Sequence, residues 1–399
     1  MTENSYPTVK LRPLKGGRHW RKGAPWIFTD QIAWDRRTKS IEPGSFARLR
    51  DIDGQEVGVI TVNPHSKIAG RLLDTSPTIS IDEAWIHSKL ARALALREQL
   101  FDKPFYRWIH AEGDGLPGVI IDRFDDVVVV QPNAAWAERM LDHIAAAVQA
   151  LTSVTTVLKN AEGRTRSLEQ LDDVSAVLCG TAPSTPIPVH MNGAIYMADV
   201  MGGQKTGLFY DQRFNHRFAA QLSHGKERVL DVFSHVGGFS LAALAGGAQR
   251  AEAVDASQAA LDLAQNGASE MGRADDFSVH KGDAFDVMTR LLEAGERYDV
   301  VICDPPAFAP HKAALENGLR AYEKTARMGA KLVKEGGYLG LCSCSHSAGL
   351  DMFRAASVRG IERAGRHGSL IHTGFAGPDH PQHAALSETG YLKALFFAL

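Results

Sequence analysis

The sequence predicts an α/β protein built around a doubly wound parallel sheet, with a smaller β-rich region in front of it. The stretch 228–255 reads as strand, glycine turn, helix and strand, an order that binds nucleotide-like ligands at the strand ends. Apolar strands and helical segments then alternate through the rest of the sequence. Five polar residues fall at the carboxyl ends of expected strands, where doubly wound sheets bind ligands: Asp231, Asp255, Asp283, Asp304 and Ser343.

The glycine turn indicates which ligand fits. A dinucleotide site needs G-x-G-x-x-G, so that pyrophosphate can lie on the helix N-terminus. Here Asp231 opens the turn and Gly237 and Gly238 lie within it. A carboxylate at that place repels pyrophosphate but suits a cationic amino-acid group, and Asp255 suits ribose hydroxyls. The turn therefore favours S-adenosylmethionine, although another doubly wound ligand site or a purely structural turn stays open.

Length and composition set the outer limits. A chain of 399 residues predicts two or three domains. No apolar run is long enough to cross a membrane, and the hydrophobic segment of a secretory signal is missing. The four cysteines are too few and too poorly spaced for a disulfide framework or a zinc site, so we expect a cytoplasmic protein without a bound metal.

We expect three domains, covering residues 1–75, 76–188 and 189–399. Short strands at 9–11, 46–50 and 56–62, with Gly, Pro and Asp turns, predict a small β barrel. Its edge is basic and carries Trp20 and Trp26, which suits phosphates and bases; a solvated arm or a mitochondrial presequence is the alternative. The basic residues are Lys10, Arg12, Lys15, Arg18, Arg21 and Lys22.

The middle region reads as α+β without a catalytic constellation. Helices are expected at 81–101 and 134–151, and prolines at 183, 186 and 188 mark the next boundary. Strands are expected at 105–111, 119–124, 127–131, 154–158 and 176–178. This region would space and orient its neighbours.

The third region opens on an unusual stretch, 189–217, rich in glycines, cations and aromatics. It leads directly into the ligand-binding strand, so a lid or rim of the site is favoured over a plain surface loop. Further helices are expected at 258–267 and 319–333. Further strands are expected at 277–280, 298–303, 338–343, 370–373 and 391–397.

Two motifs suggest the chemistry. In Asp304-Pro-Pro, the prolines make a rigid loop. This loop would point a carboxylate and carbonyl groups at whatever lies beyond the sulfonium of a bound S-adenosylmethionine. Cys344 lies just past its strand, at the mouth of the same site, and is a candidate nucleophile. Cys342 and Cys303 fall inside strands, where cysteine behaves as a small core hydrophobe.

Together these motifs resemble the PUA-domain-containing, class I S-adenosylmethionine-dependent methyltransferases of bacteria that act on cytosine C5 of 23S rRNA. The resemblance spans nearly the whole chain. It implies a PUA domain, a small α+β middle domain and a Rossmann-like methyltransferase domain. The residues that carry it are Ala24-Pro-Trp-Ile-Phe, Asp114-Gly-Leu-Pro-Gly, Ile121-Asp-Arg-Phe, Lys205-Thr-Gly, Asp211-Gln-Arg, Phe233 with Gly237-Gly-Phe, Asp304-Pro-Pro-Ala-Phe and Ser343-Cys-Ser.

The resemblance implies roles for individual residues. Asp304 would contact the target base beside the cofactor, and Cys344 would be the nucleophile. The cofactor-binding set comprises Asp231, Phe233 and Gly237 at the methionine, Asp255 at the ribose, Asp283 at the adenine, and also Ser257, Ala284 and Asp304. Substrate contacts are expected from Lys205, Asp211, Arg213 and Phe308, the last by stacking on a base that has left its helix.

These roles imply a covalent mechanism. Cytosine C5 is a poor nucleophile until a group adds at C6, and a Cys344 thiolate would form that adduct, with Asp304 stabilising it. Many RNA cytosine-C5 enzymes carry a second cysteine after the two prolines, but here that position is Ala307. The base that removes the C5 proton stays unassigned, because His346 reads more simply as a solvated loop histidine.

Two rival functions stay open. An N-methyltransferase acting on adenine or guanine would use Asp-Pro-Pro followed directly by an aromatic residue and would need no cysteine. A ribosome-assembly factor would bind RNA without catalysis, although the full set of strand-end acids argues against it. The expected partner is rRNA, naked or in an assembly intermediate, and a homodimer is an open alternative to a monomer.

Overall fold

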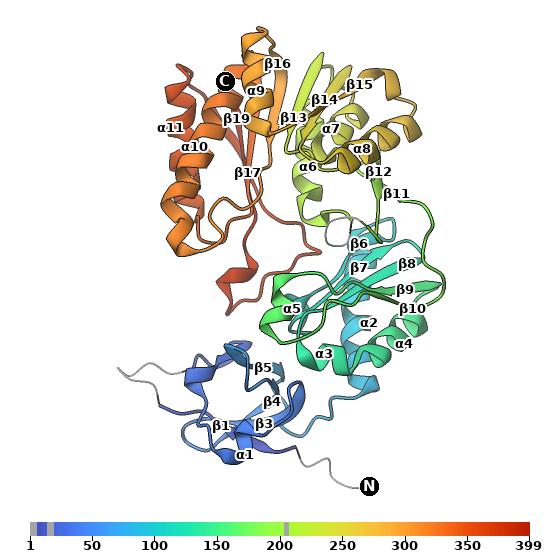
Figure 1. The fold of residues 1–399 in the computed structure, drawn as a ribbon, viewed down its shortest axis with the longest axis vertical. Helices are drawn as coiled ribbons and strands as arrows, with labels where there is room; N and C mark the ends of the chain where they lie inside the picture. Colours follow the sequence, from blue (N-terminus) through green and yellow to red (C-terminus); the bar gives the residue numbers. More distant parts are fainter. Residues whose placement is uncertain (1–5, 14–19, 203–206) are drawn as a thin grey trace. The chain divides into compact units, whose positions relative to one another are not determined.

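The structure is a computed structural model that describes residues 6–13, 20–202 and 207–399. It divides into two compact units (Figure 1). The first comprises Met1–Ala182 with Pro378–Thr389, and the second comprises Pro183–Gly377 with Gly390–Leu399.

The first unit begins with a five-stranded sheet in the order β1-β3-β4-β5-β2. β1 runs parallel to β3, and the other pairs are antiparallel. Val9, Ile27 and Ile60 are fully buried in its hydrophobic cluster. Two strands, β2 and β5, were not expected from the sequence. The elements are β1 (Thr8–Lys10), β2 (Trp26–Phe28), α1 (Arg36–Lys39), β3 (Ser45–Arg50), β4 (Glu56–Val62) and β5 (Ile68–Asp74).

A second five-stranded sheet follows in the order β10-β9-β8-β7-β6. The single helix expected over 134–151 is wrong: the chain leaves helical geometry at Met140 (φ −103°, ψ 14°), which divides it into α3 and α4. The buried Trp136 donates its indole N–H to the Pro117 carbonyl at 2.8 Å, and this contact holds α3 on the sheet. The elements are α2 (Glu83–Leu100), β6 (Phe105–His110), β7 (Val119–Phe124), β8 (Val127–Pro132), α3 (Ala135–Arg139), α4 (Leu141–Leu151), β9 (Thr156–Lys159), α5 (Arg164–Leu168) and β10 (Ala176–Cys179).

Buried ion pairs join these two sheets. Arg71 of β5 bonds Glu112 at 3.1 Å and Glu169 at 3.0 Å, and all three side chains are at most 8% exposed. Asn63 and Trp26 donate further hydrogen bonds to the same two carboxylates. Residues 6–182 therefore form one unit of the structure, and a domain boundary at residue 75 stays a prediction.

A segment far along the chain also belongs to the first unit. Within Pro378–Thr389, the Asp379 carbonyl accepts a 3.0 Å hydrogen bond from Arg97, which is fully buried and paired with Asp114. No sequence pattern predicts that this segment leaves the surrounding 189–399 region.

The second unit holds a seven-stranded sheet in the order β15-β14-β13-β16-β17-β19-β18. β13 to β17 are parallel, and β19 runs antiparallel to both of its neighbours. The predicted doubly wound α/β fold is confirmed. Its strands are β13 (Arg228–Val232), β14 (Arg250–Asp255), β15 (Phe277–Lys281), β16 (Tyr298–Cys303), β17 (Val333–Ser343), β18 (Ser369–Gly374) and β19 (Lys393–Ala398).

Helices cover both faces of this sheet. α7 and α8 contact β13, β14 and β15, whereas α9, α10 and α11 share one hydrophobic cluster; Figure 1 shows α10 and α11 side by side. The helices are α6 (Arg213–Leu222), α7 (Gly238–Ala245), α8 (Gln258–Glu270), α9 (Ala284–Glu293), α10 (Leu315–Leu332) and α11 (Leu350–Arg363). Helices α9 and α11 were not expected from the sequence.

Much of the described part of the stretch 189–217 is regular secondary structure. β11 (Ile187–Met191) and β12 (Ala194–Ala198) form an antiparallel hairpin, and α6 begins at Arg213. Within the expected lid, residues 203–206, which include Lys205, lie outside the described residues. Within the described chain, no helix is both long and apolar enough to span a membrane.

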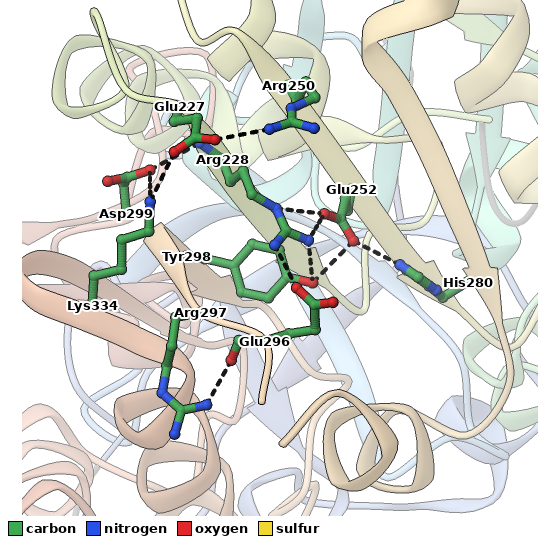
Figure 2. A network of polar contacts seen from close by, with 10 residues as sticks. All are labelled: Glu227, Arg228, Arg250, Glu252, His280, Glu296, Arg297, Tyr298, Asp299 and Lys334. Atoms are coloured by element: carbon green, nitrogen blue, oxygen red, sulfur yellow. Dashed lines mark hydrogen bonds and ion pairs between the residues drawn. The ribbon is translucent and has the colours of Figure 1, made fainter. Parts of the chain in front are cut away.

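An ionic network lies where the strands of the second sheet begin, at the opposite end from the strand-end acids. Figure 2 shows Arg228 over the Tyr298 ring, 4.5 Å from its centroid, with its guanidinium on Glu252 and Glu296. Glu252 also accepts hydrogen bonds from His280 (2.8 Å) and the Tyr298 hydroxyl (2.9 Å).

Candidate active site

Asp231 is the fully buried acid of β13, and its two oxygens have different surroundings. Oδ2 accepts hydrogen bonds from the N–H groups of Phe239 (3.1 Å) and Ser240 (2.9 Å) and from the Ser240 hydroxyl (3.0 Å). It thus caps α7 at the place where a pyrophosphate would otherwise bind. Oδ1 is buried with no hydrogen-bond partner in the described chain. Burial raises the pKa of Asp231 to about 6.

The turn between β13 and α7 is held in an unusual conformation. Phe233 and His235 have positive φ (64° and 50°), and Gly237 has φ 80°. The turn is fastened from the next strand, because the His235 N–H donates to Asp255 Oδ2 at 2.9 Å. Asp255 Oδ1 accepts the Ser257 N–H at 2.8 Å. Each carboxylate oxygen of Asp255 therefore accepts one hydrogen bond from the backbone and keeps one lone pair for a ligand.

The remaining expected cofactor residues lie at the starts of helices. Asp283 is exposed and caps α9, accepting from the N–H groups of Phe285 (2.9 Å) and Asp286 (3.2 Å). Ser257 caps α8, and Ala284 is buried as the first residue of α9. These three residues follow β14 and β15, so they lie at the same edge of the sheet as Asp231 and Asp255.

Asp304 follows β16 and interacts with two residues that precede α6. The Gln212 amide donates to Asp304 Oδ2 at 2.8 Å. Burial raises the pKa of Asp304 to about 8, and the negative charge of Asp211 raises it further than the Gln212 hydrogen bond lowers it. Asp211 Oδ2 accepts from the Tyr391 hydroxyl at 2.6 Å, whereas its buried Oδ1 has no partner in the described chain. Asp304 is therefore mainly a neutral acid at pH 7.

A serine and tyrosine network joins the Asp304 loop to the Cys344 loop. Ser345 Oγ accepts the Ala309 N–H at 2.9 Å and lies 2.7 Å from the Tyr322 hydroxyl. Ser343 Oγ donates to the same tyrosine at 2.9 Å. Both serines are fully buried, so the residues on either side of Cys344 are fixed while Cys344 itself is partly exposed.

The other cysteines of this unit lie inside the sheet. Cys303 and Cys342 are at most 1% exposed, and burial raises the pKa of each thiol well above its usual range. Neither thiol is therefore suited to act as a nucleophile at neutral pH.

The four expected substrate residues have different surroundings. Asp211 adjoins Asp304, as described above. Phe308 is partly buried in an aromatic cluster, with ring centroids 5.0 Å from Tyr322 and 6.3 Å from Phe233. Arg213 is only 8% exposed and lies over the Tyr210 ring, which disfavours a direct contact with RNA. Lys205 lies outside the described residues.

Three residues with contacts at the site were not singled out from the sequence: Gln212, Tyr322 and Lys393. Gln212 stands inside the Asp211-Gln-Arg motif, so its motif was a signal that could have found it. Lys393 is a lysine at the start of an apolar strand, β19, and it is only 5% exposed. Tyr322 carries no signal, because it looks like any apolar position of a long helix.

The donor set fits the chemistry of S-adenosylmethionine. Two buried carboxylate oxygens without partners, on Asp231 and Asp211, suit an ammonium group. Asp255 offers acceptors for ribose hydroxyls. No group of three or more His, Cys, Asp or Glu residues in the described chain is arranged to hold a metal ion.

The comparisons with known proteins define the class. The family model described as S-adenosylmethionine-dependent methyltransferase matches residues 111–397, and a PUA-like domain model matches residues 9–75. The methyltransferase match covers most of the chain, so this is a methyltransferase that uses S-adenosylmethionine and carries an N-terminal PUA-like domain.

Whole-length relatives narrow the class. The chain is 36% identical over 391 residues to the ribosomal RNA large subunit methyltransferase I of Alteromonas mediterranea, covering 97% of each chain. It is 34% identical over 411 residues to the ribosomal RNA large subunit methyltransferase of Deinococcus radiodurans, covering 99% of this chain and 98% of that one. The chain belongs to the family of these methyltransferases.

A solved structure shares the complete fold. A candidate SAM-dependent methyltransferase from Streptococcus mutans superposes with a TM-score of 0.80 at 20% identity, over 98% of this chain and 100% of that chain. This likeness supports the fold described above.

Proposed function

We propose that this protein methylates C5 of a cytosine in large-subunit rRNA, 23S rRNA in bacteria, through a covalent bond between Cys344 and C6 of the base. The rRNA substrate is supported by the whole-length relatives, whose names state it. The cytosine chemistry rests on one observation. Cys344 directly follows β17, and its flanking serine Ser345 is hydrogen-bonded to the loop that carries Asp304.

The proposed reaction begins with addition of the Cys344 thiolate to C6 of the cytosine, which makes C5 electron-rich like an enamine carbon. S-adenosylmethionine, when bound, supplies an electrophilic methyl group for that carbon. Loss of the C5 proton then lets the C6–S bond break, which restores the aromatic base and the thiolate. The chain thus supplies a nucleophile and a fixed place for the base.

Asp304 would stabilise the adduct as a neutral acid. A pKa of about 8 leaves its carboxyl protonated at pH 7, so it can donate a hydrogen bond to N3 of the cytosine, where negative charge gathers after the thiolate adds. Gln212 holds the other oxygen of the carboxyl group and sets its orientation. Asp304 is only partly exposed, which limits the competition from water for the same hydrogen bond.

The test is a pair of cysteine variants. Cys344→Ala should abolish methyl transfer to rRNA and keep the affinity for S-adenosylmethionine, because the thiol serves the base. Cys342→Ala is the matched control, since this thiol is two residues away but buried in the sheet; it should lose some stability and keep most activity.

A trapped intermediate gives the second measurement. RNA with 5-fluorocytosine at the target should form a stable protein–RNA adduct with the wild type, because fluorine at C5 blocks the proton loss that release requires. The adduct should be absent with Cys344→Ala. An active, folded Cys344→Ala protein that methylates a purine nitrogen would overturn the cytosine assignment in favour of N-methylation.

A further inference from the structure

A buried lysine lies under the loop that carries Cys344. Lys393 begins β19, where its Cα pairs with that of Ser343 across the antiparallel ladder. Its side chain is 5% exposed. The ammonium donates to the carbonyl oxygens of Ser345 at 2.7 Å and Ala348 at 2.8 Å. It is thus bonded to the residue directly after Cys344 and to the end of the same loop.

Burying a lysine is costly unless its charge is compensated. Among the described residues, hydrogen bonds occupy two of its three N–H donors. Burial lowers the pKa of Lys393 to about 8, and a negative charge on Cys344 acts in the opposite direction. At pH 7 the group is therefore mostly a cation, and it lies close enough to Cys344 for the two charges to interact.

The other titratable groups around Cys344 come from separate elements. Tyr322 of α10 also interacts with a charge on Cys344, and it is bonded to both neighbouring serines. Asp304 lies after β16 and interacts with Cys342. His346 lies on the cysteine's own loop and is exposed. Lys393 is the buried basic group of this set.

We propose that Lys393 is the positioning residue of Cys344: its ammonium fastens the loop of residues 345–348 and holds a positive charge beside the thiolate. The inference rests on the proposed function for its catalytic meaning. A thiolate stabilised in this way would be present before RNA binds. The same cation would stabilise the thiolate again when it leaves C6 at the end of the cycle.

The test measures alkylation of Cys344 by iodoacetamide across pH, read by peptide mass mapping of the protein without RNA. Only the thiolate reacts, so the pH of half-maximal alkylation reports its charge state. Lys393→Met removes the cation and keeps the length of the side chain. It should move this midpoint upward by about one unit, and Lys393→Arg should restore part of the shift.

Lys331→Met is the matched control, because Lys331 is an exposed lysine of α10 in the same unit, and it should leave the midpoint unchanged. On rRNA, Lys393→Met should lower kcat and leave the KM for S-adenosylmethionine unchanged. A folded Lys393→Met protein with the wild-type alkylation profile would overturn the proposal.

A reciprocal measurement covers the case in which Lys393→Met does not fold. Acetylation of Lys393 by acetic anhydride should shift to lower pH in Cys344→Ala, since removing the thiolate removes a charge that favours the ammonium. An unchanged Lys393 profile would refute the coupling. Both chemical profiles are independent of RNA, so an active Cys344→Ala enzyme would refute the proposed function and leave the coupling between Lys393 and Cys344 standing.

Discussion

Asp304 holds its proton where most carboxyl groups have lost it. Burial raises its pKa from 3.8 to about 8, and Asp211 adds to the effect. Between these two pH values the native protein binds a proton that the unfolded chain has released. The free energy of unfolding must therefore fall as the pH rises through this window. The Asp304 carboxyl thus lowers the stability of the fold at neutral pH, as expected where a neutral acid serves the chemistry.

Asp304→Asn should remove that pH dependence. The amide resembles the protonated carboxyl in shape and does not ionise, so the stability of the variant relative to the wild type should increase from about pH 4 to about pH 8 and then level off. Urea unfolding of the second unit at a series of pH values measures this difference. A difference that stays constant over the range would contradict the raised pKa.

Asp231 has two separable tasks, because one oxygen caps α7 and the other has no partner. Asp231→Asn should keep an oxygen for the cap and turn an N–H group toward the ligand, so we expect a stable fold and a loss of S-adenosylmethionine affinity of about one to two decades. Asp231→Ala should lose the affinity and about 1 kcal/mol of stability as well.

Calorimetry with S-adenosylmethionine and urea unfolding separate the two effects. Equal cofactor affinity in wild type and a folded Asp231→Asn protein would show that the unpartnered oxygen does not face the ligand.

Among the secondary-structure elements, the parallel strands of the second unit carry polar groups at both of their ends. The carboxyl ends carry the site, and the amino ends of β13, β14 and β16 carry the network around Arg228 (Figure 2). Burial would raise the pKa of Glu252, but hydrogen bonds from His280 and Arg228 outweigh it and lower that pKa to about 2. The network therefore stabilises the fold above pH 4.5 and loses this contribution as the pH falls toward 2.

Arg228→Met should leave Glu252 without its main cation. Because the pair is only partly exposed (23% and 12%), we expect a loss of about 2–3 kcal/mol in the free energy of unfolding. The double variant Arg228→Met/Glu252→Gln should lose less, since no unpaired charge remains. The loss from the single variant should shrink between pH 5 and pH 3, as measured by urea unfolding; a pH-independent loss would point to packing over the Tyr298 ring instead.

At the scale of the whole molecule, the PUA-like region is tied to the middle region by charges that neither could bury alone. Deleting residues 1–75 would leave Glu112 and Glu169 without Arg71, and breaking such pairs is strongly destabilising. A deletion would therefore damage the first unit as well as any RNA contact. Substitutions on its surface are a cleaner test of RNA binding.

Arg21→Gln/Lys22→Gln should weaken rRNA binding and reduce its salt dependence. Both side chains belong to the basic cluster expected from the sequence, and both are exposed. Each lost phosphate contact should lower the slope of log affinity against log salt by about 0.7–0.9. Lys331→Gln/Arg354→Gln, on the exposed sides of α10 and α11, is the control with the same loss of charge. Equal slopes for the two double variants would remove the PUA-like region from RNA binding.

Local sequence patterns were enough to predict the sheet of the second unit and the acids along its edge. Apolar runs and glycine turns act over a few neighbouring residues, so β15 and β16 were located to within a residue of their bounds. Because the carboxyl ends of parallel strands meet at one edge, Asp231, Asp255 and the Asp304 loop could be grouped without coordinates.

The neighbours of these residues, in contrast, depend on how the chain folds in three dimensions. Gln212 reaches Asp304 across 92 positions of sequence, and Lys393 reaches the Cys344 loop because an antiparallel strand returns beside β17. The return of Pro378–Thr389 to the first unit is of the same kind. Local patterns record whether a residue is apolar or turns the chain. They do not record which distant strand will lie beside it. The burial, the ion pairs and the shifted pKa values of this site all depend on which strands become neighbours.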